Sequence, residues 1–304
     1  MRKIVIAGGT GFLGQVLIKH FKELKDELII LTRGQGGERN GVKYLHWNGE
    51  QVDKWTEAIE GVDVLINLSG RTVNCRYTAK NKKEIMDSRL LSTRALGEAI
   101  KTLENPPKVW MNASSATIYE ESFDQANDEE TGQIGKGFSV DVCQQWEKEF
   151  NEVKVNGVRK ICLRTAMVIG EGGPFLELMT KIVKFRLGGR QGSGEQFVSW
   201  LHEKDFTEIL EFLIENDDLS GVFNLCAPKP ERNKDMMAML RKACGVKIGL
   251  PALTPMVHLG AFFMRTEAEL PLKSRKVVPA RLLKEGYKFR FADMENALND
   301  LIGR

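Results

Sequence analysis

The hydrophobic positions at the start of the chain change abruptly from a continuous run to a helical spacing. Ile4 to Ala7 are all apolar, as in a strand that is buried on both faces of a parallel sheet. From Phe12 to Phe21 the apolar residues recur at steps of three and four. A turn with glycines at positions 8, 11 and 14 separates the two segments. The pattern predicts a strand, a tight turn and the N-terminus of an amphipathic helix.

Apolar runs and helical spacings alternate in the same way along most of the chain. We expect strands at 27–32, 42–46, 63–70, 109–113, 160–170, 197–200 and 222–226, and a flexible loop at 34–41. We expect helices at 52–59, 80–101, 135–156, 175–186, 206–215, 234–244 and 293–301. Strands that alternate with helices predict an α/β fold, here a Rossmann-type doubly wound parallel sheet with a smaller C-terminal α+β lobe.

The expected division of the chain follows from this alternation. A Rossmann domain should take residues 1–170 together with the strand and helix around 205–227. A smaller lobe on the substrate side should take 171–204 and 228–304. The cleft between the two is then the expected site for a small-molecule substrate.

Composition adds mainly exclusions to this picture. The 304 residues carry a net charge of +3 with basic and acidic residues interspersed, so we expect no nucleic-acid partner. The first strand begins at residue 3, and no apolar run reaches eighteen residues, so we expect neither a signal peptide nor a membrane span. Five scattered cysteines and four histidines predict reduced thiols, no metal centre and a cytoplasmic location.

The glycine turn has the spacing and the context of a dinucleotide site. Gly8 permits the tight turn, Gly11 lets backbone approach a pyrophosphate, and Gly14 lets the helix lie close to the strand. Free N–H groups at the start of the helix favour an anion there. The alternative is a structural glycine turn that binds no nucleotide.

The end of the second strand selects between the two nicotinamide cofactors. An NAD-type site usually has an Asp or Glu there, which accepts hydrogen bonds from the ribose hydroxyls. This chain has Thr32 and Arg33 instead. An arginine can form two hydrogen bonds to a 2′-phosphate, so we expect NADP(H) in preference to NAD(H). The alternative is an ordinary solvated arginine at the start of a loop.

Polar residues follow two further strands at the edge where a ligand would bind. Leu68 and Ser69 end one strand and should contact the cofactor through backbone and hydroxyl. The hydroxyl cluster from Ser114 to Thr117 ends the next strand, where it could hold a carbonyl or a sugar hydroxyl over a nicotinamide. A serine turn without that role is the alternative.

Two polar residues near position 203 have structural interpretations. Asp205 is expected to cap the N-terminus of the helix at 206–215. His202, close to Trp200, is expected to be a hydrogen-bonded hinge rather than a general base.

These motifs together resemble the extended short-chain dehydrogenase/reductase family of the sugar-nucleotide epimerase type. Gly8-Gly9-Thr10-Gly11-Phe12-Leu13-Gly14 matches its glycine fingerprint, and the turn that starts at Ser115 matches its active-site serine. Other segments resemble an atypical branch called epimerase family proteins: 31–33, 67–70, 88–90, 146–147, 185–188, 192–194, 199–202 and the tail 279–298. The tail resembles the C-terminal domain of unknown function of that branch. The resemblance implies NADP(H) binding by Gly8, Thr10, Gly11, Phe12, Leu13, Gly14, Thr32, Arg33, Leu68, Ser69, Glu84, Arg89 and Val168.

One departure from the family bears directly on catalysis. Typical members carry Tyr-x-x-x-Lys on the helix after the serine turn, where the tyrosine moves a proton and the lysine lowers its pKa. The aligned positions here are Phe138 and Val142, and no tyrosine lies between Tyr119 and Tyr287. Ser115 would then orient the substrate, and Tyr119 is the only phenol expected nearby.

Two functions remain open at this point. The resemblance implies an NADP(H)-dependent isomerase or oxidoreductase, an epimerase-like enzyme that acts on a nucleotide-sugar or a related small carbonyl or hydroxyl compound. The missing Tyr-x-x-x-Lys pair favours the alternative, a non-catalytic NADP(H)-binding redox sensor or scaffold. The sequence determines neither the substrate nor the oligomeric state.

Overall fold

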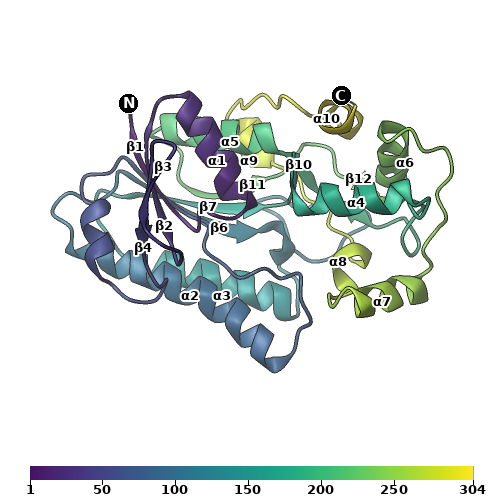
Figure 1. Ribbon diagram of the computed structural model, residues 1–304, viewed down its shortest axis with the longest axis horizontal. Helices are drawn as coiled ribbons and strands as arrows, with labels where there is room; N and C mark the ends of the chain where they lie inside the picture. Colours follow the sequence, from purple (N-terminus) through teal and green to yellow (C-terminus); the bar gives the residue numbers. More distant parts are fainter. Residues whose placement is uncertain (304) are drawn as a thin grey trace.

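The computed structural model describes residues 1–303 and is built around an eight-stranded sheet (Figure 1). The strand order is β11-β7-β6-β5-β1-β2-β4-β3, and every neighbouring pair is parallel except β3 with β4. Their bounds are β1 Lys3–Ala7, β2 Glu27–Thr32, β3 Gly37–Arg39, β4 Val42–His46, β5 Val64–Asn67, β6 Val109–Ser115, β7 Arg159–Thr165 and β11 Gly221–Leu225. The expected Rossmann-type doubly wound sheet is confirmed.

Helices cover both faces of this sheet, as its buried strands require (Figure 1). α1 (Phe12–Glu23) and α5 (Glu203–Glu215) contact each other over one face. α2 (Ala79–Thr102) and α3 (Phe138–Glu152) contact each other over the other face. Short 3₁₀ helices η1 (Lys54–Ala58) and η2 (Ala116–Ile118) lie in two of the connections.

The chain leaves the centre of the sheet in both directions from β1. Val5 of β1 pairs with Ile29 of β2 on one side and with Leu65 of β5 on the other. From β2 the chain continues to one edge, and from β5 it continues to the opposite edge. The carboxyl ends of β1, β2 and β5 therefore surround the topological switch point, where open α/β sheets bind their ligands.

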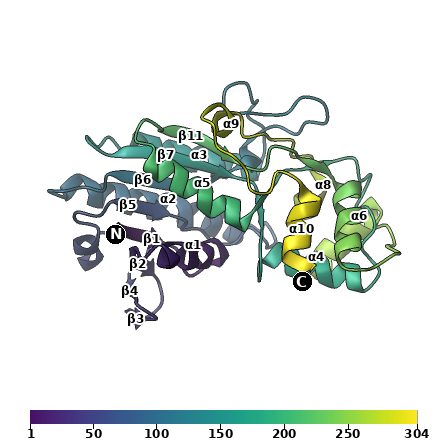
Figure 2. The same ribbon diagram turned by 90° about the horizontal axis from the view of Figure 1, so that it is seen from above.

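A second group of elements lies at one end of the sheet (Figure 2). Its apolar core joins α4, α6 and α10. Short strand pairs β8 with β10 and β9 with β12 lie between these helices and the sheet. The bounds are β8 Met167–Ile169, α4 Pro174–Lys184, β9 Phe197–Val198, β10 Trp200–His202, β12 Glu231–Arg232, α6 Asn233–Ala243, α7 Thr254–Phe263, α8 Glu269–Leu272, α9 Ala280–Lys284 and α10 Met294–Ile302.

The structure differs from the expected elements in three places. The segment 160–170 is divided into β7 and β8, because β8 turns away from the sheet to pair with β10. The expected loop 34–41 contains β3, a polar edge strand that pairs antiparallel with β4. α9 contacts β11 of the large sheet, although 228–304 was expected to lie wholly in the smaller lobe.

The expected N-cap role of Asp205 is wrong. α5 begins at Glu203, and its N-cap is His202. The His202 Nδ1 accepts a hydrogen bond from the Lys204 N–H at 3.1 Å. The Asp205 carboxylate instead accepts the backbone N–H groups of Arg290 at 2.7 Å and Phe291 at 2.9 Å. Asp205 therefore holds the C-terminal segment against α5.

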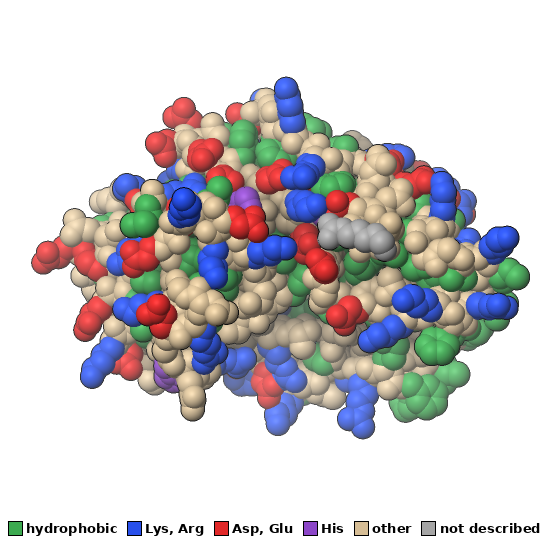
Figure 3. All heavy atoms as spheres, turned by 45° about the horizontal axis from the view of Figure 1, so that its top comes forward, with side chains coloured by type: hydrophobic (Ala, Val, Ile, Leu, Met, Phe, Trp, Pro, Cys, Tyr) green, Lys and Arg blue, Asp and Glu red, His purple; other side chains and the backbone are tan. Residues whose placement is uncertain are grey.

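Apolar side chains are exposed together at the end of the molecule that carries α7 (Figure 3). The face shown there otherwise mixes basic and acidic side chains. The exposed apolar residues around α7 are Ile248, Leu250, Leu253, Met256, Leu259, Phe262, Phe263 and Met264. Within residues 1–303, no helix is both long enough and apolar enough to span a bilayer. All five cysteines are free thiols.

Candidate functional site

In the glycine turn between β1 and α1, neighbouring backbone leaves no room for a side chain at Gly8 or Gly14. Gly8 has a φ of +77°, and a Cβ there would lie 2.9 Å from the Ser69 nitrogen. A Cβ at Gly14 would lie 2.4 Å from the Gly9 Cα, which no backbone tolerates. At Gly11 the nearest protein atom would be 3.8 Å away. The outer side of the turn at Gly11 is therefore open to a ligand.

The N-terminus of α1 presents unpaired donors at this open side. Gly11 is the N-cap, and no side chain of the described residues caps the helix or adds an acidic group to its first turn. Unsatisfied N–H groups and the helix dipole attract an anion at such an end. Thr10 is exposed and Phe12 and Leu13 are half-buried around it.

The end of β5 adds a buried hydroxyl with no partner. Ser69 lies against Gly8, and its N–H donates to the Asn67 side chain at 3.0 Å. Its Oγ is inaccessible to solvent and has no hydrogen-bond partner among residues 1–303. A buried hydroxyl without a partner costs free energy, so this atom is suited to a ligand. Leu68 is half-buried beside it.

The end of β2 places a free cation at the same edge of the sheet. Arg33 is exposed, and within the described part of the chain its side chain makes no hydrogen bond or ion pair. Thr32 is buried, and its Oγ1 accepts the Gly34 N–H at 3.1 Å. The hydroxyl proton of Thr32 and the guanidinium of Arg33 thus remain to donate to a phosphate.

Arg89 of α2 lies beside the turn that follows β5. Its guanidinium donates to the carbonyl oxygens of Arg71 at 3.1 Å and Ile85 at 2.9 Å. It lies 5.1 Å from the ring centre of Trp146, and it would contact a Cβ at Gly70. Burial lowers the pKa of Arg89, yet it stays a cation in the physiological range. Arg89 therefore brings a positive charge next to Ser69.

Two other residues implied by the resemblance lie further from the glycine turn. Glu84 is half-exposed and forms an ion pair with Arg71, so its carboxylate already has a cationic partner. Val168 is half-buried on β8 and packs against the apolar core of the sheet.

The serine turn after β6 is stabilised by a buried ion pair in the adjacent core. Glu147 and Arg164 join through two hydrogen bonds of 2.8 Å. The Ser114 hydroxyl donates to Glu147 at 2.6 Å. Ser115 is half-buried, and its Oγ accepts the Thr117 N–H at 3.2 Å. The ion pair thus fixes the turn, while Ser115 stays at the edge of the sheet.

The structure does not bring Tyr119 to the cleft as a proton donor. Its side chain is only 2% exposed. Its hydroxyl donates to the Asn224 amide oxygen at 2.9 Å and accepts from Arg164 at 2.8 Å. Burial, the largest influence, raises its pKa. With its single proton already donated to Asn224, Tyr119 has the setting of a structural tyrosine.

Cys143 of α3 lies beside the serine turn, one residue after the aligned Val142. Phe138 packs its ring on Tyr77, and Val142 is buried. Cys143, not Val142, accepts the Ser115 N–H, and Ser139 lies one turn before it. Burial raises the pKa of Cys143 to about 12, so it is a neutral thiol. Neither register supplies the tyrosine and lysine of typical members.

Sequence reasoning missed two residues that the structure brings to this region. Tyr77, in the loop before α2, lies 3.4 Å from the Ser139 Oγ. Arg275 is half-buried near Glu269 and Glu121, and its side chain makes no hydrogen bond or ion pair with the residues the structure describes, although its backbone bonds to Phe197 and Ser199. Both contacts join segments that lie far apart in the sequence, and neither segment has a periodicity that would mark it.

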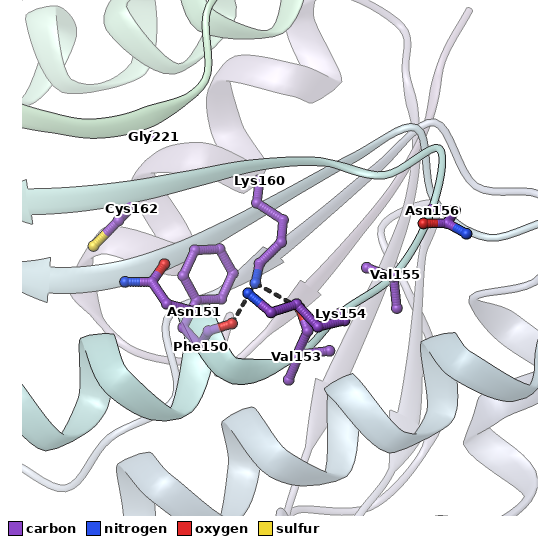
Figure 4. Close-up of a pocket in the computed structure, with 9 residues that line it drawn as sticks. All are labelled: Phe150, Asn151, Val153, Lys154, Val155, Asn156, Lys160, Cys162 and Gly221. Atoms are coloured by element: carbon purple, nitrogen blue, oxygen red, sulfur yellow. Dashed lines mark hydrogen bonds between the residues drawn. The ribbon is translucent and has the colours of Figure 1, made fainter.

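Two cavities lie on different edges of the molecule. The first, of about 260 Å³, is beside the serine turn and is lined by Tyr119, Gly135, Val140, Arg275 and neighbouring residues. The second, of about 320 Å³, lies at the C-terminal end of α3 (Figure 4). There Lys160 donates to the carbonyl oxygen of Phe150 and, at 2.9 Å, to that of Val153. Lys160 thus caps α3, and this second cavity lies away from the glycine and serine turns.

Other chemistry is not indicated by the described residues. Across positions 1–303, no group of three or more His, Cys, Asp or Glu side chains has the arrangement of a metal site. His202 is fully buried and stacked on Phe291 at 3.9 Å, and burial lowers its pKa to about 4. It is a neutral helix cap, a role that was expected of Asp205, and its burial does not suit a general base in the cleft.

Comparisons with known proteins cover the whole chain. The NAD dependent epimerase/dehydratase family matches residues 4–226, and a domain of unknown function, DUF1731, matches 254–301. Epimerase family protein MW0731 of Staphylococcus aureus strain MW2 is 33% identical over 99% of both chains. An epimerase family protein of Staphylococcus epidermidis is 32% identical over 99% of both chains.

Solved structures give the same result. Human epimerase family protein SDR39U1, determined with NADPH, superposes with a TM-score of 0.89 at 27% identity over 99% of both chains. A nucleoside-diphosphate sugar epimerase from Corynebacterium glutamicum has a TM-score of 0.79 and 26% identity over 99% of this chain and 58% of that one. The chain belongs to the NAD-dependent epimerase/dehydratase family of extended short-chain dehydrogenases/reductases, in the branch of epimerase family proteins that carry this C-terminal domain.

Proposed function

We propose that the protein binds NADP(H) across the carboxyl ends of β1, β2 and β5. One observation carries the proposal: the buried Ser69 hydroxyl has no partner among the described residues, and the Ser69 nitrogen lies against Gly8 in the turn that leads to the uncapped start of α1. The pyrophosphate would lie on the N–H groups of α1, and Ser69 would gain a hydrogen bond. The human relative was determined with NADPH, which supports the same cofactor here.

The preference for NADP(H) over NAD(H) rests on Arg33. The exposed guanidinium has no partner in residues 1–303 and follows β2, where a 2′-phosphate would lie. Thr32 would add a second donor beside it. A site for NAD usually places a carboxylate at this point, which would repel the phosphate.

The substrate is proposed to be a nucleotide-sugar or a related small carbonyl or hydroxyl compound. Two polar groups would serve it: Ser115 at the end of β6, and the half-buried cation Arg275, which lines the neighbouring cavity. Because Arg275 has no described partner, an anionic group of the substrate would pair with it. The relative from Corynebacterium glutamicum is named as a nucleoside-diphosphate sugar epimerase, which supports this class.

The protein residues would then bind, orient and exclude water around the reacting carbon. When bound, the nicotinamide supplies or accepts a hydride. The Ser115 hydroxyl, which donates to the Thr117 Oγ1 at 3.1 Å, would turn this hydrogen bond to the substrate oxygen, and Arg89 would add positive charge to the site. The Glu147–Arg164 pair would keep Ser115 in position from beneath.

A screen of substrates tests the catalytic half of this proposal. NADPH oxidation and NADP⁺ reduction are followed with a panel of UDP-sugars and small aldehydes and ketones, and epimer formation is followed by chromatography. We expect turnover of at least one member of the panel, and we expect its rate to be lower in the Ser115→Ala variant. Lack of turnover across the panel, with NADPH still bound, would contradict an enzymatic role.

The second candidate function is a non-catalytic NADP(H)-binding sensor or scaffold. It is favoured by Phe138 and Val142, which occupy the positions that align with the tyrosine and lysine of typical members. In this case bound NADPH would exchange no hydride with any member of the panel. The two functions therefore give opposite results in one experiment.

A further inference from the structure

The loop between β5 and α2 carries a tyrosine that is fixed at the junction of three elements. The Tyr77 N–H donates to Glu267 at 2.7 Å, and Arg76 lies 5.1 Å from the ring centre of Phe262. The Tyr77 ring packs edge-on against Phe138 of α3 at 4.9 Å. These contacts hold the phenol between the loop, α3 and the segment that leads into α8.

The phenol is the first group in a chain of hydrogen-bonding side chains. Ser139 donates its hydroxyl proton to Glu269 at 2.8 Å. A serine has one hydroxyl proton, so toward Tyr77 it can only accept. The Tyr77 hydroxyl lies 3.4 Å from the Ser139 Oγ, which is long, as is common in sites without ligand. The direction of donation is therefore from Tyr77 to Ser139 to Glu269.

The Glu269 end of this series of hydrogen bonds is exposed to solvent. The Glu269 carboxylate pairs with Lys273 at 2.9 Å, and its side chain is 30% exposed. Burial opposes ionisation of Glu269, but hydrogen bonds from Lys273 and Ser139 outweigh it and lower its pKa. Glu269 is thus an ionised acceptor that can exchange protons with water.

The Tyr77 end of this series of hydrogen bonds lies toward the serine turn, on the proposed substrate side of the cofactor site. Ser139 lies one helical turn before Cys143, about 6 Å along the axis of α3. Cys143 in turn accepts the N–H of Ser115, the residue proposed to hold the substrate. The phenol of Tyr77 therefore contacts the first turn of α3 at Phe138 and Ser139, although it comes from a different segment.

We propose that Tyr77, Ser139 and Glu269 form a proton relay, in which the Tyr77 hydroxyl exchanges a proton with the oxygen of a carbonyl or alcohol substrate. The proposal rests on the proposed function and names the group that the α3 sequence lacks. Tyr77 is the catalytic residue of the relay, and Ser139 and Glu269 act through it.

The proton balance of the alcohol oxidation is complete with these groups. The substrate carbon loses a hydride to the oxidised nicotinamide, and its hydroxyl proton moves to the Tyr77 oxygen. The original phenol proton moves to Ser139, and the serine proton moves to the Glu269 carboxylate, which releases it to water. Reduction of a carbonyl reverses each transfer and takes the proton from water.

The surroundings of Tyr77 set how its phenol titrates. Burial is the largest influence and raises the pKa of Tyr77. Nearby negative groups raise it further, and Arg89 and Arg275 are the cations within electrostatic range. The titratable groups that face it are Cys75 from its own loop, Arg89 from α2, Glu267, Glu269 and Arg275.

The first experiment tests the relay without cofactor or substrate. The chain has four tyrosines, so the absorbance at 295 nm of the wild type minus that of Tyr77→Phe isolates the Tyr77 titration. Glu269→Gln removes a negative charge and should lower the midpoint. Ser139→Ala removes the acceptor of the phenol proton, which stabilises the neutral phenol, and should lower the midpoint as well. Ser139→Thr keeps a hydroxyl and should restore the wild-type midpoint.

The outcome of the titration decides whether the three groups are connected. Lower midpoints in both variants, with the wild-type midpoint kept in Ser139→Thr, support the relay. A midpoint of either Glu269→Gln or Ser139→Ala that equals or exceeds that of the wild type would overturn it. Circular dichroism at each pH confirms that the compared proteins are folded.

The second experiment uses whichever UDP-sugar, aldehyde or ketone the panel shows to be turned over. Tyr77→Phe should reduce kcat by about 10²- to 10⁴-fold, the usual loss for a general acid or base, with little change in NADPH affinity. Tyr44→Phe, on β4, is the matched control and should keep its rate. Full activity of Tyr77→Phe would overturn the catalytic role of Tyr77. If no member of the panel is turned over by the wild type, the result counts against the proposed function, and the relay is then tested by the titration.

Discussion

Removal of the buried Glu147 carboxylate should destabilise the protein strongly. Glu147 and Arg164 are 9% and 11% exposed at their side chains and share two hydrogen bonds of 2.8 Å. Glu147→Ala leaves the Arg164 cation buried without its partner, which costs about 3–5 kcal/mol. For 304 residues at about 2.1 cal/mol/K each, the unfolding entropy is about 0.6 kcal/mol/K, so Tm should fall by roughly 5–8 °C.

The same helix offers a matched control for this experiment. Glu149 also binds an arginine through two hydrogen bonds, of 2.8 and 2.9 Å, but its partner Arg94 is 49% exposed. Glu149→Ala should therefore cost about 1 kcal/mol or less. Both variants are unfolded by heat and by urea and followed by circular dichroism. Equal losses of stability in Glu147→Ala and Glu149→Ala would refute the argument from burial.

Two further predictions concern the turn and the pH dependence. Gly14→Ala should abolish NADPH binding measured by fluorescence, because its Cβ would lie 2.4 Å from the Gly9 Cα, whereas Gly260→Ala meets no atom within 4 Å and should bind normally. Burial lowers the pKa of His202 to about 4, so between about pH 4 and 6.5 the unfolded chain binds more protons than the folded protein. The free energy of unfolding should therefore fall as the pH drops through this range, by on the order of 3 kcal/mol. His202→Asn keeps an acceptor for the Lys204 N–H and should flatten that dependence in urea titrations; an unchanged profile would assign the loss to other groups.

The parallel sheet could be predicted from the sequence because its strands are buried on both faces. Ile4 to Ala7 and Val64 to Asn67 are fully buried or nearly so, and such strands read as unbroken apolar runs. The edge strand β3, Gly37–Arg39, is exposed throughout and carries no such signal. The turn at Gly8 was predictable for a related reason, since a short apolar run, three glycines and a helical spacing follow one another directly.

The proposed catalytic region could not be predicted from the sequence because its contacts are long-range. Tyr77 and Ser139 are 62 residues apart, and Ser139 and Glu269 are 130 apart. The expectation for Tyr119 used proximity in sequence to Ser115, but the hydroxyl turns into the core toward Asn224. His202 and Asp205 are both suited to cap a helix, and only the contacts of Asp205 with Arg290 and Phe291 distinguish their roles.

A comparison of NADPH and NADH binding tests the central claim most directly. Fluorescence or calorimetric titration of the purified protein should give a lower Kd for NADPH by about 10- to 150-fold, since a charge-assisted hydrogen bond contributes about 1.5–3 kcal/mol. Arg33→Ser should remove most of this difference. Arg39→Ser, which changes an exposed arginine on β3, should keep it. Equal affinities of the wild type for the two cofactors would contradict the role of Arg33, and binding of neither would contradict the dinucleotide site itself.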